Sequence, residues 1–84
     1  GRAVVKTEEE KYGVIDPSGR FLIDPIFDYF SRFNDGRAEV VLKGKCGYLN
    51  FSGGFEIAAT FQLCTEFSEG IASVFDGADW HFVD

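Results

Sequence analysis

The sequence predicts an all-β fold of tandem antiparallel three-stranded repeats, arranged as a β-meander array. The first observation is repetition, because KYGVIDPSG at Lys11–Gly19 returns thirty-four residues later as KCGYLNFSG at Lys45–Gly53. The second is that apolar residues alternate along short stretches, which is typical of strands with one buried face. The third is that Pro, Gly and β-branched residues interrupt every window that could form a long helix. The pattern leaves open whether the array closes toward a barrel.

The copies divide the 84 residues into units of similar length. We place the first repeat at about residues 1–35, the second at about 36–69 and a partial third at 70–84. A chain of this size forms a single small domain, residues 1–84. Because the sequence contains no Met and its third unit stops after a second strand, we expect the chain to be part of a longer array.

The first strand of each unit is expected at Ala3–Val5, Ala38–Val40 and Ala72–Val74. Ala and Val occupy alternate positions in all three copies, so their side chains point to the same face of the strand. The small alanines allow a neighbouring side chain or strand to come close. We therefore expect this face to be buried.

The second strand is expected at Tyr12–Asp16, Cys46–Asn50 and Trp80–Asp84. Apolar residues occur on both of its faces, which favours a central position in the sheet. Glycine inside a strand costs stability and usually marks a bulge or a close approach. We expect a large ring from elsewhere in the chain to lie over Gly13 and Gly47.

A tight turn follows the second strand. Asp16–Gly19 has the residues of a type I turn closed by a left-handed glycine, and Asn50–Gly53 repeats it without the proline. Each turn leads into a third strand, expected at Phe21–Ile23 and Phe55–Ile57. The segments rich in Phe that come next are interpreted as irregular connectors whose rings fill the core, with a single helical turn left open: Pro25–Phe33 and Ala59–Phe67.

The combined motif resembles the WG repeat, also called the KWG repeat. It consists of a [Trp/Tyr]-Gly-x-Ile-Asp strand, a Ser-Gly turn, an aromatic connector and the Phe-Ser-Glu-Gly-x-Ala-x-Val stretch of Phe67–Val74. The chain departs from the motif in having Tyr12 and Cys46 at the signature Trp, and in having His81 in place of glycine after Trp80. The resemblance implies an all-β repeat domain of a mostly bacterial family, with no catalytic residue to transfer.

Composition disfavours several classes of partner. The chain has 8 basic and 14 acidic residues and a formal charge of −6, so it offers no basic surface for nucleic acid. No stretch approaches the roughly 20 apolar residues that span a bilayer, so we expect no membrane insertion. Two cysteines, Cys46 and Cys64, are too few for a disulfide framework, and they lack the short spacing of a metal site. We expect both to be free, buried thiols, and the sequence does not indicate a redox role.

The sequence gives little support for a catalytic or metal-binding site. The aspartates considered as an acid–base pair are Asp16, Asp24, Asp28 and Asp35. We expect them to cap turns or to be solvated, because unpaired Asp is mostly exposed. The run Glu8–Glu10 lacks the spaced ligands of a calcium loop and is interpreted as solvated. His81 with Cys46 or Cys64 would be a nucleophile–base pair, but no third group supports it. We expect no enzyme activity, no metal and no cofactor.

The remaining candidates are the aromatic residues Tyr12, Tyr29, Tyr48 and Trp80. Aromatics at strand spacing are usually core residues. Tyr29 is expected to be exposed, because the second repeat has Leu63 at the same position.

Function is expected to lie in recognition. The first hypothesis is a non-enzymatic repeat module for protein–protein interaction, with another protein or neighbouring repeats as partner, because loops vary on a constant frame. The alternative is a carbohydrate or cell-wall binding module that uses exposed aromatics. Unpaired strand edges also allow self-association. The sequence assigns no particular binding residues and indicates no compartment.

Overall fold

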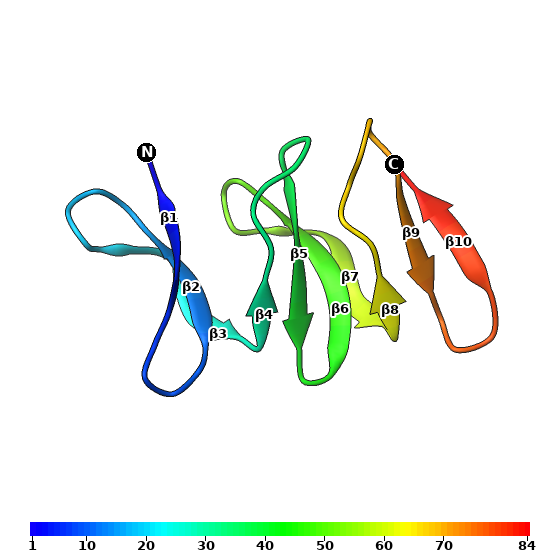
Figure 1. The fold of residues 1–84 in the computed structure, drawn as a ribbon, viewed down its shortest axis with the longest axis horizontal. Coiled ribbons are helices and arrows are strands. Elements are labelled where there is room, and N and C mark those ends of the chain that lie inside the picture. Colours follow the sequence, from blue (N-terminus) through cyan, green and yellow to red (C-terminus); the bar gives the residue numbers. More distant parts are fainter.

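The computed structural model describes the whole chain, residues 1–84, as strands and loops without a helix, which confirms the predicted all-β class (Figure 1). The strands are β1 (Ala3–Lys6), β2 (Tyr12–Ile15), β3 (Phe21–Phe27), β4 (Tyr29–Phe30), β5 (Arg37–Leu42), β6 (Lys45–Asn50), β7 (Phe55–Phe61), β8 (Leu63–Cys64), β9 (Ala72–Phe75) and β10 (Trp80–Val83). They form three antiparallel sheets with the orders β1-β2-β3, β4-β5-β6-β7 and β8-β9-β10. The sheets stay separate, so no barrel closes.

The sheets follow one another along the long axis of the molecule (Figure 1). Its extents are 42 × 27 × 15 Å, so the array is elongated and flat. The first strands β1, β5 and β9 run in the same direction, and the hairpin loops that follow them all lie at the lower edge of Figure 1. The copies differ in sequence at these loops. The variable loops are therefore gathered along one edge of a repeated frame.

The structure corrects the prediction of irregular connectors at Pro25–Phe33 and Ala59–Phe67. The third strand runs through Pro25 as far as Phe27, and the short strands β4 and β8 then pair with β5 and β9 of the next sheet. No helical turn forms. The physical reason is that backbone N–H and C=O groups need partners, and the next sheet offers a free edge. For example, the Asp28 N–H donates to the Val41 carbonyl at 2.8 Å.

Gly13 and Gly47 are required for a different reason from the one predicted. The space beside each glycine is occupied by the backbone of the neighbouring strand and not by an aromatic ring. A Cβ on Gly13 would lie 2.6 Å from the carbonyl oxygen of Ile23, and one on Gly47 would lie 2.5 Å from that of Ile57. At both glycines the pairing with β3 or β7 shifts register, as in a β-bulge. The expectation of an overlying ring is therefore wrong.

The turns at Asp16–Gly19 and Asn50–Gly53 form as predicted. In each, the last N–H donates to the first carbonyl, at 3.0 Å and 3.1 Å. Both closing glycines have a φ of 91°, which side chains on L-residues disfavour. The turn residues thus set the register in which the third strand returns.

The core consists of two apolar clusters, each shared by successive sheets. The first contains Val14, Ile23, Phe27, Phe30, Ala38, Val40 and Leu49. The second contains Tyr48, Phe67, Ala72 and Val74. The predicted buried face of the first strand is confirmed in β5 and β9, where the Ala and Val side chains are at most 2% exposed. Burial of such side chains stabilises the fold by about 1.5–3 kcal/mol for each large one.

Cys46 and Cys64 form a disulfide bond, so the prediction of two free thiols is wrong. Cys46 lies in β6 of the second sheet and Cys64 in β8 of the third, with their Cα atoms 6.2 Å apart. Their separation of 18 residues does not reveal this pairing, because it depends on β8 folding back against β6. The disulfide joins the second sheet to the third.

Candidate functional site

A groove with both apolar and polar lining lies where the first sheet meets the second. One wall is β3, and the other is the turn between β6 and β7 with the start of β7. The groove has a volume of about 300 Å³. Its lining residues are Leu22, Ile23, Asp24, Ile26, Phe27, Ser52, Gly53 and Phe55. We call it the β3–β7 groove.

The bulged path of β3 decides which side chains reach the groove surface. Ile23 and Phe27 point into the core and are 6% and 3% exposed, whereas Leu22 and Ile26 are 46% and 53% exposed. Phe55, on the opposite wall, is 45% exposed, and its ring packs edge-on against Phe27 with centroids 6.2 Å apart. Single exposed apolar residues are ordinary, but a group of them beside a hollow is typical of an interaction site.

The second repeat is polar at the same positions. Leu22 corresponds to Glu56, and Ile26 corresponds to Thr60. Nevertheless β7 has the same length as β3 and the same register shifts against its neighbour. The fold therefore does not require apolar residues at these two positions.

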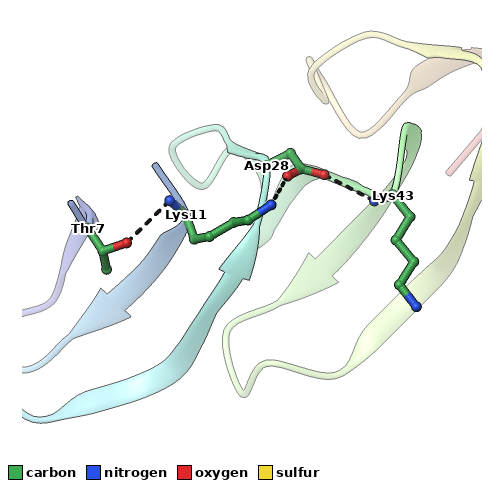
Figure 2. Close-up of polar contacts among 4 residues, drawn as sticks. All are labelled: Thr7, Lys11, Asp28 and Lys43. Atoms are coloured by element: carbon green, nitrogen blue, oxygen red, sulfur yellow. Dashed lines mark hydrogen bonds and ion pairs between the residues drawn. The ribbon is translucent and has the colours of Figure 1, made fainter. Parts of the chain in front are cut away.

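Asp28 holds the end of β3 against the second sheet, as Figure 2 shows. Its Oδ1 accepts a hydrogen bond from Lys11 Nζ, and its Oδ2 accepts one from the backbone N–H of Lys43 at 3.1 Å. The hydrogen bond from Lys11 is the main reason that the pKa of Asp28 lies below its usual value. The Lys11 backbone N–H in turn donates to Thr7 Oγ1 at 3.3 Å. Asp28 thus connects the β1–β2 loop to the β5–β6 hairpin.

The other three aspartates lie in separate surroundings. Asp16 Oδ1 accepts hydrogen bonds from the hydroxyl and the backbone N–H of Ser18, at 2.7 and 2.9 Å. The hydroxyl bond is the largest cause of the lowered pKa of Asp16. Asp35 accepts from the Gly70 N–H at 2.8 Å, and Asp24 is exposed at the groove. The geometry assigns Asp16 to turn capping and Asp35 to a contact between loops of successive repeats.

His81 lies beside a carboxylate and not beside a thiol. Its Nε2 is 2.7 Å from Asp76 Oδ2 within the β9–β10 hairpin. The pKa of Asp76 lies well below its usual range. The hydrogen bond from the Asp79 backbone N–H is the largest cause, and the hydrogen bond with the His81 side chain is the second. Both cysteine sulfurs are in the disulfide, so the chain has no free thiol to act as a nucleophile.

The acidic run Glu8–Glu10 is exposed in the β1–β2 loop, where Glu10 pairs with Lys6 at 3.5 Å. Nowhere do three His, Cys, Asp or Glu side chains gather in a way that could hold a metal ion. The structure also contains no helix with the length and hydrophobicity to cross a membrane.

The four aromatic candidates do not share one environment. Tyr48 is fully buried, and its hydroxyl donates to the Thr65 carbonyl at 2.5 Å. Burial is the main reason that its pKa is raised to about 12. Tyr12 is half-buried and packs edge-on against Tyr29, with ring centroids 6.2 Å apart. Tyr29 is 40% exposed, as the sequence predicts, and Trp80 is 55% exposed, which the sequence does not indicate.

Sequence reasoning missed Leu22 and Ile26 as surface residues. The sequence singles out neither of them, because Leu22 lies in the expected third strand and Ile26 in the segment interpreted as an irregular connector. One signal in the sequence could have found them: they are apolar where the second repeat has Glu56 and Thr60. A core position would keep its apolar character in both copies.

One repeat of the chain matches a known protein family. Residues 12–46 match the family model described as WG containing repeat. The matched segment begins at the start of β2 and ends within β6, so it spans one full period of the array. No curated protein and no solved structure matches the chain significantly. Residues 12–46 are therefore recognised as a repeat similar to those of the WG family.

Proposed function

We propose that this chain is a non-enzymatic repeat module that binds another protein through the β3–β7 groove. The proposed ligand is an extended segment with bulky apolar side chains. The observation that supports this proposal is the exposure of Leu22 and Ile26 beside a hollow. Because the second repeat forms the same strand with Glu56 and Thr60, the apolar pair is not needed for folding. Exposed apolar residues without a folding role favour recognition.

The size of the groove supports a peptide ligand. Its volume of about 300 Å³ lies at the small end of the range for pockets that enclose whole small molecules. It therefore suits one or two side chains of a longer segment that continues over the surface. Asp24 and Ser52 at the groove provide polar groups that could bind the backbone of such a segment.

The variable hairpin loops give independent support. They lie together along one edge of the array (Figure 1), where each repeat presents a different sequence. Repeat proteins commonly recognise partners with variable positions on a constant frame.

The double variant L22E/I26T tests the proposal. It places the residues of the second repeat in the first, so the fold should be kept, and circular dichroism with thermal unfolding checks this. Peptides selected from a phage-displayed library against the wild-type chain should carry bulky apolar residues. We expect them to bind the double variant at least about tenfold more weakly, equivalent to about 1.4 kcal/mol.

The matched control is Leu63→Thr, which removes an exposed apolar side chain in β8. It should leave peptide affinity unchanged. Equal binding by the wild type and the folded double variant would contradict the proposal.

The alternative function, carbohydrate or cell-wall binding, requires a row of exposed aromatic rings. Trp80 and Tyr29 are exposed, but Tyr48 is buried and Tyr12 packs against Tyr29, so the row is interrupted. Calorimetric titration with cell-wall polysaccharide separates the two functions. Heat of binding that is lost in Trp80→Ala and kept in L22E/I26T would favour the carbohydrate function.

A further inference from the structure

The outer row of β3 places one carboxylate between the two exposed apolar side chains of the β3–β7 groove. Leu22, Asp24 and Ile26 alternate with the buried Ile23 and Phe27, and all of them line the hollow. Asp24 is exposed and takes part in none of the ion pairs of the chain. The groove therefore presents a free negative charge with apolar surface on both sides.

The strand itself does not need this charge. The second repeat has Ala58 at the position of Asp24, and β7 keeps the length of β3 and its register shifts. The carboxylate of Glu56 on β7 is already neutralised, because it pairs with Arg37 at 3.5 Å. A carboxylate that the fold neither requires nor neutralises is available to a ligand.

The exposure of this row is a property of an internal junction. The corresponding residues of the second repeat, Glu56, Ala58 and Thr60, are exposed although one sheet precedes them and another follows. The row of β3 already has the second sheet after it. A further repeat packed in the same way before the first sheet would therefore leave the row open.

An extended segment that binds along this row has to match it in both shape and charge. Alternate side chains of such a segment point to one face, so its residues i, i+2 and i+4 face the groove together. The two apolar positions favour bulky apolar side chains. The carboxylate between them favours a cation, because hydrogen bonds between charged groups are the stronger ones.

We propose that the groove selects segments in which a Lys or Arg stands between two bulky apolar residues at alternate positions. Asp24 is the residue that determines the preference for the cation. This inference rests on the proposed binding function and adds the chemical class of its ligand.

The net charge acts in the same direction over a longer range. The chain has a formal charge of −6, which attracts a cationic partner before contact. This attraction acts on any cationic peptide, whereas Asp24 acts only on a cation at one position of the segment. The experiment therefore has to separate the two effects.

Parallel selections from one phage-displayed peptide library against the wild type and Asp24→Asn test the inference. Circular dichroism checks the fold of the variant, which should be kept because Asp24 is exposed and Ala58 replaces it in the second repeat. Peptides selected by the wild type should carry a Lys or Arg two residues away from each of two bulky apolar residues. Peptides selected by Asp24→Asn should keep the apolar pair and lose the preference for the cation.

The affinities of one selected peptide measure the effect. Replacement of its central cation by Gln should weaken binding to the wild type about two- to fivefold, as for an exposed ion pair, and should leave binding to Asp24→Asn unchanged. Asp24→Lys should reverse the preference and bind the peptide better with Glu in place of the cation. Glu9→Gln is the matched control, because it removes one exposed negative charge outside the groove. This control should retain the full dependence on the peptide cation.

Three results would overturn the inference. One is a set of wild-type peptides without a cation between their apolar residues, and another is the same cation preference in the Asp24→Asn selection. The third is an equal loss in Glu9→Gln and Asp24→Asn, which would show that only net charge matters. In each case L22E/I26T would still weaken peptide binding if the groove is the site, so a failure of this inference is distinguishable from a failure of the proposed function.

Discussion

Gly47 shows how one residue lets a strand lie at the centre of its sheet. The carbonyl of Ile57 and the backbone that follows it occupy the space where a side chain would begin. Gly13 has the same surroundings in the first repeat, with backbone of Ile23 and Pro25 overhead. The glycine of the WG motif is therefore a packing requirement of the bulge in the third strand.

Gly47→Ala should lower the free energy of unfolding by about 2–3 kcal/mol, because its Cβ would overlap backbone that has no room to move. Urea unfolding followed by fluorescence measures this. Gly54→Ala is the matched control, since its Cβ would meet only side-chain atoms at 3.6 Å or more. The control should change stability by less than about 0.5 kcal/mol. Similar losses for both variants would contradict the backbone explanation.

Glu39 makes stability depend on pH. Burial, and then the charge of Glu66, raises the pKa of Glu39 above its ordinary value of 4.5. Because the pKa of Glu39 is raised in the folded state, protonation of Glu39 stabilises the fold. This contribution is complete below pH about 4.5 and is lost as the pH rises through the folded-state pKa. Glu39→Gln should therefore raise the thermal midpoint at pH 7 and leave it unchanged at pH 4.

Thermal unfolding across this pH range checks the prediction. Glu56→Gln is the control, because Glu56 is a carboxylate that pairs with Arg37 at 3.5 Å. It should gain nothing at pH 7. A Glu39→Gln variant that is no more stable than the wild type at pH 7 would contradict the assignment.

At the scale of elements, the two-residue strands β4 and β8 join the repeats. Each follows the third strand of one sheet and pairs with the first strand of the next. At the second junction the Cys46–Cys64 disulfide adds a covalent link between β6 and β8. At the first junction Asp28 supplies polar links to Lys11 and Lys43. The two junctions therefore have the same strand pairing. They differ in the side-chain link that stabilises it, a disulfide at the second junction and hydrogen bonds of Asp28 at the first.

Reduction of the disulfide should destabilise the chain by about 3 kcal/mol, the chain-entropy value for a loop of this length. Thermal unfolding with and without dithiothreitol measures the change. The double variant C46A/C64A should start from the lower stability and show no response to dithiothreitol. A wild-type midpoint that is insensitive to full reduction would contradict the proposed contribution.

Asp28→Ala should lower the free energy of unfolding slightly, because it removes the hydrogen bonds from Lys11 and the Lys43 N–H in a position that solvent screens. Asp24→Ala is the matched control, since Asp24 is exposed and makes no side-chain hydrogen bond. Chemical denaturation of both variants measures the difference. If the two lose the same stability, Asp28 does not hold the junction.

At the scale of the whole molecule, stability is shared between neighbours. Each apolar cluster contains residues of two successive sheets, so no sheet has a complete core of its own. The middle sheet contributes to both clusters and contains the most buried strands. Arrays of this kind behave as a row of units coupled to their nearest neighbours.

Hydrogen exchange should therefore be slowest in β5 and β6 and fastest in the outer strands β1 and β10. Reduction of the disulfide should speed exchange mainly in β8, β9 and β10, because their sheet depends on the link to β6. Mass spectrometry of peptic fragments resolves these segments. Uniform exchange along the chain, or acceleration confined to the first sheet, would contradict this distribution of stability.

The sequence by itself determined the all-β class, the tandem strands and the Asp16–Gly19 turn. These features depend on local chemistry, because alternation of Ala and Val and the conformational preferences of Asp, Pro and Gly act within a few residues. The resemblance to the WG repeat was likewise carried by short motifs. Each of them is visible without knowledge of what lies beside it.

Only the tertiary structure decided the bulge over Gly47, the pairing of Cys46 with Cys64 and the exposure of Leu22 and Ile26. Each depends on which segments of different repeats come together, and similar sequences meet different neighbours along the array. Phe82 illustrates the point, since it repeats the position of Tyr48 but is 83% exposed where Tyr48 is buried by the third sheet. A side chain is buried by what packs against it, and that is a property of the assembled sheets.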